Sequence, residues 1–570
     1  MKGFKQLRPR TAALLVGGAI AITLLVGFQV GESHRFRMAK NLDIFNAIVK
    51  ELDLLYVDTI RPEKLIKEGI DNMLLTLDPY TEYYPEEDRS ELEQMIKGSF
   101  GGIGSLISYN TKLKRVIIAE PYEGTPAATV GLKAGDILMY IDSVNLEGKS
   151  TAEVSQLLRG QEGTSFRLRI ERPGLQGKRT PMEFTMIRRS IQTPAVPYAS
   201  LLDGGVGYIN LSTFTGSPAK EFKQAFLDLK KQGASSLVID LRANGGGLMD
   251  QAVEIVNYFL PRGKVVVTTK GKTPQAAGVY KTQREPLDTE IPIAILVSNA
   301  TASAAEILSG ALQDFDRGIV VGQRTFGKGL VQVPRSLPYG GTLKLTTSKY
   351  YIPSGRCVQA IDYKNRNEDG SVGSIPDSLT KVFYTAGGRP VRDGGGVTPD
   401  LAVKAEKAPN ILYYLVRDHL IFDFATDYCL RHPSVDSPER FVLSDAEYAR
   451  FKDQVKAANF TYDQQSGRIL QKLKETAEFE GYLTEASDEF KALEQKLKHN
   501  LDRDLDYFAK DIRRMIMDEI IKRHYFQRGS IALALKDDPA LQEACKALTD
   551  PDRYRAMLAP RPVEQAPNSN

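Results

Sequence analysis

Residues 291–307 read IPIAILVSNATASAAEI. The apolar run 291–297 predicts a buried strand, the small residues after it a turn, and a helix should begin around Ser303. Two further runs, 236–241 and 319–321, also predict buried strands, and helical segments alternate with them. Alternation of this kind over residues 191–360 is typical of an α/β domain.

The turn before the expected helix places Ser303 at a helix N-terminus. Free backbone N–H groups and the helix dipole favour developing negative charge at such a position. A serine there can attack a carbonyl while neighbouring amides hold the oxyanion, and the small neighbours Ala302, Ala304 and Ala305 leave room for a substrate backbone. The alternative is a strand-to-helix turn whose Ser or Thr only caps the helix.

A serine nucleophile needs a base, and the positions of the histidines bear on its identity. The five histidines are His34, His419, His432, His499 and His524, so none lies between residues 35 and 418. A Ser-His-Asp triad would require the C-terminal helices to reach back to Ser303. Lysine is the known substitute for histidine in this role.

Lys328 is the best lysine candidate, in the segment GQRTFGKGLVQ at residues 322–332. Its glycine neighbours let the backbone bend and keep bulk away from the amine. With an ordinary pKa only about one lysine in 2,500 is neutral at pH 7, so an apolar pocket would have to lower that value. Gln332 is a polar group that could orient the amine. The alternatives are a surface lysine or a phosphate-binding loop, but Gly329 stands where such a loop needs Ser or Thr.

A third segment, VIDLRANGGGL at residues 238–248, predicts a strand, a glycine-rich turn and a helix over 249–259. Taken alone it suits a phosphate-binding loop as well as an oxyanion donor. Beside a serine site it favours the second interpretation, because glycine brings backbone N–H groups close to a substrate.

Composition excludes several classes of protein. The 42% hydrophobic and 26% charged residues are those of a globular protein, and the net charge of +4 comes without a dense basic stripe, so we expect no nucleic-acid partner. The three cysteines, Cys357, Cys429 and Cys545, form no CxxC pair. They predict neither a disulfide framework nor a zinc site, although one bridge stays possible. We expect no cofactor and no metal.

The remaining parts of the chain differ in pattern. Residues 38–97 have helical periodicity, and residues 405–560 are rich in helical patterns. Residues 98–190 combine glycine clusters, β-rich runs at 115–119 and 166–170, and a helix-like stretch at 151–158, as in a small, partly open β-barrel. Residues 361–395 are polar and predict a loop or insertion, and residues 561–570 a disordered tail.

The order LRANGGG, SNATASAAEI and GQRTFGKGLVQ resembles that of the C-terminal processing peptidases, or tail-specific proteases. LDPYTEY at 77–83 and GVTPD at 396–400 extend the resemblance over roughly residues 40–402. It implies a protease core over 191–402, related to crotonase-like and ClpP-like folds. It also implies that Ser303 is the nucleophile, Lys328 the base and Gln332 the residue that orients Lys328. The oxyanion N–H groups would come from Ala304 and from Gly245 or Gly246.

The same resemblance makes residues 98–175 a PDZ domain, with FGGIGSLI at 100–107 as its carboxylate-binding loop and the following strand. Gly101, Gly102, Ile103 and Gly104 would bind the peptide, because glycines expose N–H groups and an open strand edge pairs with an extended chain. Arg159 follows the helix-like stretch and would sense a bound peptide. Its alternative role is to complement the dipole at that helix end.

The N-terminus predicts a membrane anchor. Lys2, Lys5, Arg8 and Arg10 precede the uncharged run 11–28, so residues 1–32 read as an uncleaved signal anchor, with a cleaved signal peptide as the alternative. We therefore expect a single-pass protein of the bacterial inner membrane whose catalytic region lies on the periplasmic side.

The function that follows is a serine endopeptidase with a Ser-Lys dyad, which selects exported proteins by their free C-termini. An adaptor protein or a homo-oligomer are possible partners, and residues 405–560 could serve either of them or brace the core. The competing interpretations are a PDZ scaffold on an inactive protease core, and a nucleotide or acyl-CoA enzyme that uses the glycine loops.

Overall fold

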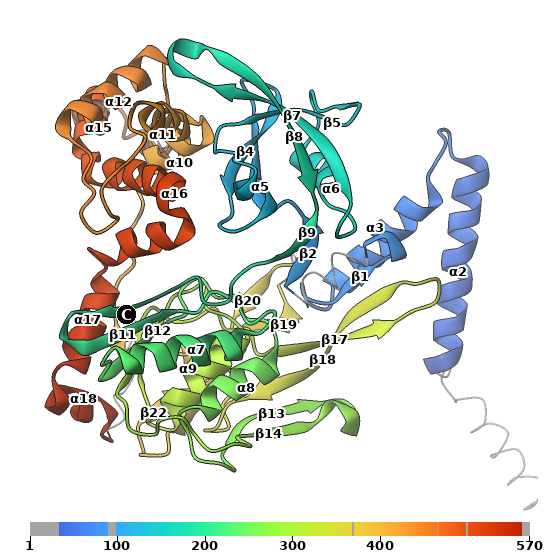
Figure 1. Ribbon diagram of the computed structural model, residues 1–570. Helices are drawn as coiled ribbons and strands as arrows, with labels where there is room; N and C mark the ends of the chain where they lie inside the picture. The colour runs from blue at the N-terminus through green and yellow to red at the C-terminus, as the bar shows by residue number, and fades with distance from the viewer. Residues whose placement is uncertain (1–33, 89–97, 368–369, 464, 498–499, 561–570) are drawn as a thin grey trace, which may run out of the picture. The chain divides into compact units, whose positions relative to one another are not determined.

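The computed structural model describes residues 34–88, 98–367, 370–463, 465–497 and 500–560, and the chain divides into two compact units after Tyr83 (Figure 1). The first unit contains α2 (His34–Leu55) and α3 (Pro62–Leu75), and β1 (Glu82–Tyr84) lies at the boundary between the units. These two helices lie largely within the stretch 38–97, for which the sequence predicted helical structure. Residues 89–97 lie outside the described part.

The expected membrane protein is not supported. The candidate anchor at residues 11–28 lies outside the described residues. Within the described ranges, no helix has both the length and the apolar character needed to cross a bilayer. The prediction of a single-pass inner-membrane protein is therefore corrected, and we do not keep it.

A mostly parallel sheet forms the centre of the second unit. Its strand order is β10-β11-β12-β15-β16-β23, and only β10 runs antiparallel to its neighbour. The three predicted buried strands are confirmed, because every residue of β12, β15 and β16 is buried. Strands covered on both faces read as continuous apolar runs, which explains the pattern. The strands are β10 (Tyr198–Leu202), β11 (Val206–Asn210), β12 (Ser236–Asp240), β15 (Ile293–Val297), β16 (Ile319–Gly322) and β23 (Leu401–Ala402).

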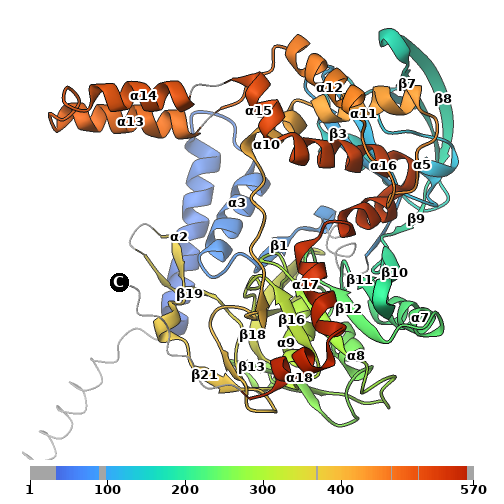
Figure 2. The ribbon, with the colours of Figure 1, turned by 90° about the vertical axis from the view of Figure 1, so that its left-hand side faces the viewer.

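Helices cover both faces of this sheet (Figure 2). Side chains of a strand point alternately to its two faces, so Leu237 and Ile239 join one hydrophobic cluster while Val238 joins another. The first cluster includes α7 (Pro218–Lys231), α8 (Met249–Asn257) and α9 (Ala304–Asp314). The second includes α17 (Pro539–Leu548) and α18 (Pro551–Leu558) from the end of the chain. The last helices thus cover the second face of the central sheet.

An antiparallel sheet adjoins these elements in the same unit. It contains β13 (Val265–Gly271), β14 (Gly278–Lys281), β17 (Leu330–Ser336) and β18 (Thr342–Tyr351), with β18 paired to both β13 and β17. A register shift lies between Val331 and Gln332. Such a bulge bends a strand and re-aims its side chains.

A β-rich domain precedes the core, as expected, with its sheet order β3-β4-β5-β7-β8. The sheet continues through β8, within the β-rich stretch expected at 98–190 but beyond residue 175, where the resemblance placed the end of a PDZ domain. Ser150 and Glu153 form a capping box that begins α6 at the predicted place. The elements are β3 (Ser105–Asn110), β4 (Arg115–Pro121), α5 (Pro126–Thr129), β5 (Ile137–Ile141), β6 (Val144–Asn145), α6 (Thr151–Leu158), β7 (Ser165–Pro173) and β8 (Arg179–Ile187), while β2 (Ser99–Gly102) pairs with β9 (Arg189–Gln192).

Residues 361–395 contain more structure than the loop that the sequence suggested. They form two hairpins, β19 (Ile361–Arg366) with β20 (Val372–Ser374) and β21 (Val382–Tyr384) with β22 (Pro390–Arg392). Few of their residues are buried. Because a two-stranded ribbon need not bury a face, its sequence carries no apolar alternation, and its polar composition reads as a loop.

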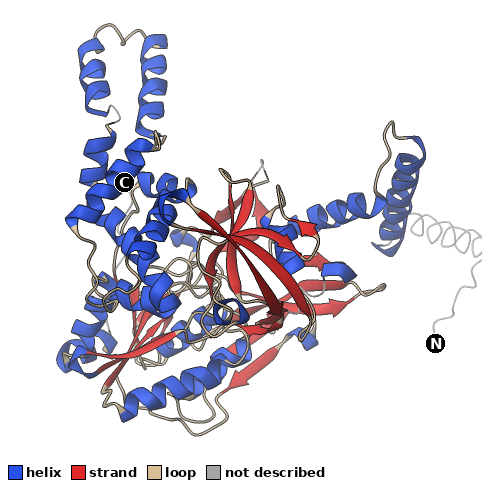
Figure 3. Ribbon diagram, turned by 45° about the horizontal axis from the view of Figure 1, so that its top comes forward, coloured by secondary structure: helices blue, strands red, loops and turns tan. Residues whose placement is uncertain are grey.

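After β23 the regular structure of the described residues is wholly helical (Figure 3), as the sequence predicted for residues 405–560. A separate hydrophobic cluster holds several of these helices together, including residues of α11, α12 and α16. The helices are α10 (Asn410–Arg417), α11 (Leu420–Arg431), α12 (Asp445–Ala457), α13 (Gln465–Phe479), α14 (Ser487–Leu497), α15 (Leu501–Tyr507) and α16 (Ala509–Leu535). The relation of the core to crotonase-like and ClpP-like folds stays a prediction.

Candidate active site

Three loops meet at one edge of the central sheet. Strands β12, β15 and β16 are parallel neighbours, so their carboxyl ends lie at the same edge, where open α/β sheets bind ligands. The glycine turn follows β12, Ser303 lies in the loop after β15, and Lys328 lies in the loop after β16. The strand order therefore brings together segments that are far apart in the sequence.

Ser303 has a strained backbone. Its φ is +58° and its ψ is −119°, a region that non-glycine residues rarely adopt. Such a conformation costs about 1–3 kcal/mol and persists where the surroundings impose it, often at functional sites. Ser303 directly precedes α9, as predicted, and is half-buried. A serine exposed on a strained strand-to-helix turn is also how α/β hydrolases present their nucleophile.

The glycine turn lies directly against Ser303. A Cβ added to Gly246, whose φ is +98°, would lie 2.7 Å from the Cβ of Ser303 and 3.0 Å from the N of Ala304. Only glycine therefore fits at position 246, where the turn packs against Ser303. The N–H of Gly246 already donates to Oδ1 of Asn244 over 2.8 Å, whereas Gly245 is exposed.

A buried carboxylate joins the Ser303 and Lys328 segments. Oε2 of Glu306 accepts from the backbone N–H of Ser303 and from that of Lys328, each over 2.9 Å. Oε1 accepts from the N–H of Gly327 over 2.8 Å and from the hydroxyl of Thr325 over 2.5 Å. The side chain of Glu306 is fully buried. Four donors thus converge on one side chain in the first turn of α9.

The environment of Glu306 perturbs its ionisation. Burial raises the pKa of Glu306 to about 7, and hydrogen bonds from Thr325, Lys328, Ser303 and Gly327 oppose that shift. A carboxylate surrounded by donors is favoured in its charged form, while loss of water disfavours it. Here the loss of water dominates, so the group titrates near neutral pH.

Tyr350 makes a second bridge between the same two segments. Its side chain is almost fully buried. Its hydroxyl donates toward the carbonyl oxygen of Ser303 at 3.1 Å and that of Lys328 at 2.6 Å. Sequence analysis missed both bridging residues. For Glu306 a signal existed, because Ser303 and Glu306 have the spacing of a capping box; Tyr350 offered none.

Gln332 lies on β17 beside the bulge. Its amide Nε2 donates to Oγ1 of Thr346 on β18 over 3.1 Å. This bond fixes the Gln332 side chain from the neighbouring strand. Its expected role in orienting Lys328 stays a prediction.

The residues expected to bind a peptide lie together in the β-rich domain. The N–H of Gly160 donates to the carbonyl oxygen of Gly101 over 3.1 Å, and the guanidinium of Arg159 lies over the ring of Phe100, 5.1 Å from its centroid. Gly102 lies beside them on β2, and Ile103 is buried. A Cβ on Gly104, whose φ is +73°, would lie 2.4 Å from that of Thr125, so this turn requires glycine.

Four of the five histidines lie within the described residues. Three of these four make contacts outside the loops that hold Ser303 and Lys328. His419 Nε2 lies 3.3 Å from the carbonyl oxygen of Tyr109, His432 stacks on Tyr428, and His524 lines a cavity together with residues of the β-rich domain. His34 begins α2, and His499 lies outside the described residues.

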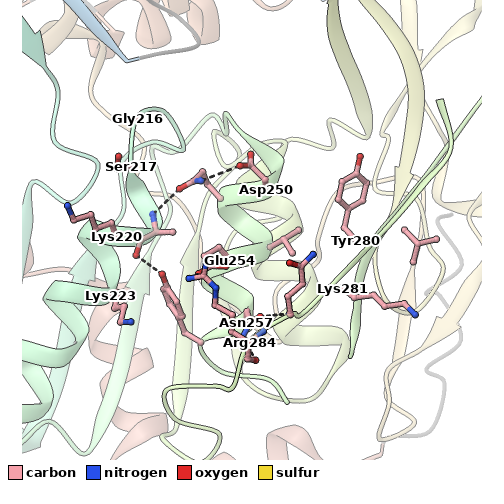
Figure 4. Close-up of a pocket in the computed structure, with 16 residues that line it drawn as sticks. Gly216, Ser217, Lys220, Lys223, Asp250, Glu254, Asn257, Tyr280, Lys281 and Arg284 are labelled. Carbon is pink, nitrogen blue, oxygen red and sulfur yellow. Dashed lines mark hydrogen bonds and ion pairs between the residues drawn. The ribbon is translucent and has the colours of Figure 1, made fainter. Parts of the chain in front are cut away.

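A cavity of about 670 Å³ lies away from these loops, between α7, α8 and β14 (Figure 4). Lys220, Glu254, Tyr280 and Arg284 are among the residues that line it, and an ion pair of 2.9 Å joins Glu254 to Arg284. Ser303, Lys328 and the expected oxyanion residues do not line it. This cavity therefore does not contain the residues expected to carry the chemistry.

Comparison with known proteins agrees with the arrangement of motifs. The sequence model of peptidase family S41 matches residues 205–365, a PDZ domain model matches 117–172, and a model described as probable PDZ-protease, C-terminal helical domain, matches 411–548. A carboxy-terminal-processing protease of Bartonella bacilliformis is 35% identical over 352 residues, which are 61% of this chain and 79% of that protein. Carboxy-terminal processing protease CtpA of Bacillus subtilis is 30% identical over 410 residues, 71% of this chain and 84% of the other.

The chain belongs to the carboxy-terminal processing protease family. This protease is therefore a serine peptidase, with the fold of peptidase family S41, a PDZ domain and a C-terminal helical domain. The resemblance seen in the sequence is confirmed, and we set aside the interpretations as an inactive scaffold or as a nucleotide or acyl-CoA enzyme. Among solved structures, the photosystem II D1 C-terminal processing protease is 27% identical, with 65% of this chain and 89% of that chain covered and a TM-score of 0.34.

Proposed function

We propose that the protein is an endopeptidase that recognises the free C-terminal residues of protein substrates through its PDZ domain and cleaves them through a Ser303–Lys328 dyad. Lys328, as a neutral amine, takes the proton from the Ser303 hydroxyl while Oγ attacks the scissile carbonyl. The protonated lysine then gives that proton to the leaving amine. An acyl-enzyme forms on Ser303, and water hydrolyses it with Lys328 again as base.

The observation that carries this proposal is the shared carboxylate of Glu306. The same oxygen accepts from the N–H groups of Ser303 and Lys328, so the backbones of nucleophile and base are held in a fixed relation. Rigid placement of reacting groups is a large part of enzymatic rate enhancement. Gln332, fixed by Thr346, completes the group by orienting the lysine.

The oxyanion site follows from the neighbours of Ser303. Ala304 is the first residue of α9, where backbone N–H groups have no partner within the helix. Of the two candidate glycines, Gly246 already uses its N–H to hold Asn244. We therefore assign the second oxyanion N–H to Gly245, with Gly246 supplying the close packing against Ser303.

Recognition of the substrate rests on the loop at residues 101–104 and on Arg159. The bond between Gly160 and Gly101 places Arg159 beside this loop, where a guanidinium can attract a terminal carboxylate. An adaptor protein or a homo-oligomer stays a prediction.

Amidation of a substrate tests this recognition. A peptide with an apolar, free C-terminus should be cleaved with a kcat/KM roughly 10- to 100-fold higher than its C-terminally amidated form, because charge-assisted hydrogen bonds to the carboxylate are lost. Competition between the two peptides, followed by mass spectrometry of the products, gives the ratio directly. Equal cleavage of both forms would contradict C-terminal recognition.

Arg159→Ala should reduce the discrimination between free and amidated peptide by at least about 5-fold, the lower end of common coupling energies. Arg167→Ala is the matched control, since Arg167 is an exposed arginine on β7 of the same domain. If both variants discriminate as well as the wild type, Arg159 only complements the end of α6.

A further inference from the structure

The loop after β12 is tied to a residue of the C-terminal helical region. Arg242 donates from Nε to both oxygens of Asp240, over 3.0 and 3.1 Å, and from Nη2 to Oδ2 of Asp240 over 2.6 Å. Its remaining nitrogen, Nη1, lies 2.5 Å from Oδ2 of Asp538. Asp240 and Asp538 are both buried, so a guanidinium joins two carboxylates at the edge of the active-site loops.

Asp538 has two separate tasks, one for each of its oxygens. It is the residue before α17, and its Oδ1 accepts from the N–H groups of Ala540 and Leu541, each over 3.0 Å. Its Oδ2 faces Arg242. Because α17 packs on β12, β15 and β16, the carboxylate connects a docked helix to the loop that follows β12.

Arg242 lies just before the glycine turn, and that turn is bonded to the loop of Ser303. Oδ1 of Asn244 accepts from the N–H of Gly246, and the carbonyl oxygen of Asn244 accepts from the N–H of Ala302 over 3.0 Å. The hydroxyl of Ser298 donates to the carbonyl oxygen of Arg242. A displacement of Arg242 would therefore also displace the glycine turn and the loop that precedes Ser303, the two segments between which the oxyanion forms.

Both carboxylates compensate the buried charge of Arg242. Burial lowers the pKa of Arg242, but the hydrogen bonds and charge of Asp240, together with the charge of Asp538, raise it above its ordinary value. A buried ion pair that loses one partner leaves an uncompensated charge. Removal of the Asp538 charge thus leaves Arg242 with less compensation and frees Nη1 to seek another acceptor.

We propose that Asp538 is a positioning residue of the active site, which holds Arg242 and through it the loop 243–247 in the conformation that presents the oxyanion N–H group. This inference rests on the proposed function, because it assumes catalysis at Ser303. It gives the C-terminal helical region an indirect part in catalysis, through one residue that reaches the edge of the site.

Asp538→Asn separates the two tasks of this side chain. Asparagine still caps α17 through Oδ1 but brings no charge to Arg242. Asp550→Asn is the matched control. Asp550 caps α18 in the same way, with bonds to Asp552 and Arg553, and none of the ion pairs recorded among the described residues involves it.

We expect kcat of Asp538→Asn to fall roughly 10- to 100-fold below that of Asp550→Asn, as for displacements of about 1 Å in a site. KM should stay within about twofold. Both variants are assayed well below their thermal midpoints, because loss of the buried charge also lowers the stability of Asp538→Asn. Hydrogen exchange of the amides at 243–247 should be faster only in Asp538→Asn. Equal kcat values, or a loss of kcat that disappears at temperatures where both variants are fully folded, would overturn the proposal.

A double-mutant cycle with Arg242→Lys gives a second test. Lysine can pair with one carboxylate but cannot reproduce the fork that binds both. If Asp538 acts through Arg242, the double variant loses little more kcat than Arg242→Lys alone, whereas additive losses overturn the proposal. Ser303→Ala is measured beside them. Activity in that variant would refute the proposed function itself; an inactive Ser303→Ala with a normal Asp538→Asn would refute this inference alone.

Discussion

Ser303→Ala and Lys328→Ala should each lower the rate of proteolysis by roughly 10⁴-fold or more while the protein stays folded. Groups that act as one catalytic unit show losses of this size when either is removed. Lys328→Arg should be equally inactive, because a guanidinium does not lose its proton in proteins. Initial rates of cleavage of an unfolded protein, with mass spectrometry of the products, measure the effect.

Two controls come from the cavity between α7, α8 and β14. Ser217→Ala and Lys281→Ala change the same residue types at positions that line this cavity (Figure 4), and both should retain activity within about twofold. Retention of a tenth of the wild-type rate in Ser303→Ala or Lys328→Ala, at an unchanged thermal midpoint, would contradict the dyad.

Glu306→Gln should have the second large effect, a fall in kcat of about 100-fold. All four groups that contact Glu306 are donors, and an amide NH₂ in place of one oxygen cannot accept from them. A buried donor without its acceptor costs about 1–3 kcal/mol of stability. The backbones of Ser303 and Lys328 then lose the acceptor that they share, so we expect a larger loss of catalytic rate than of stability.

The loss of stability caused by Glu306→Gln should depend on pH in a defined direction. The pKa of Glu306 rises from 4.5 to about 7 on folding, so between these values the folded protein binds more protons at this group than the unfolded chain does. The contribution of Glu306 to the free energy of unfolding therefore falls as pH rises through this window. Since the variant lacks this titration, its stability deficit relative to the wild type should be larger at pH 5 than at pH 8.

Denaturant unfolding at the two pH values checks the prediction, with Glu254→Gln as the control. Glu254 is a partly exposed carboxylate paired with Arg284, and such surface pairs contribute about 0–1 kcal/mol. A deficit of Glu306→Gln that is equal at both pH values, or larger at pH 8, would contradict the raised pKa.

Much of the fold could be predicted because its signals are local. The apolar runs that became β12, β15 and β16 are continuous, as strands covered on both faces must be, and the helix-like stretch at 151–158 became α6. The hairpins at 361–395 were missed for the opposite reason, since an exposed ribbon carries no apolar periodicity.

The sequence by itself determined the family, the candidate nucleophile and base, and the order of the domains, because glycine turns, small residues around a serine and a glycine-flanked lysine are patterns within short segments. Only the tertiary structure decided that Glu306 and Tyr350 bridge the Ser303 and Lys328 segments. It likewise decided that α17 and α18 cover the core sheet and that Asp538 reaches Arg242. The physical reason is that periodicity records which side chains leave water, whereas the contacts between distant segments depend on strand order and on which surfaces pack together.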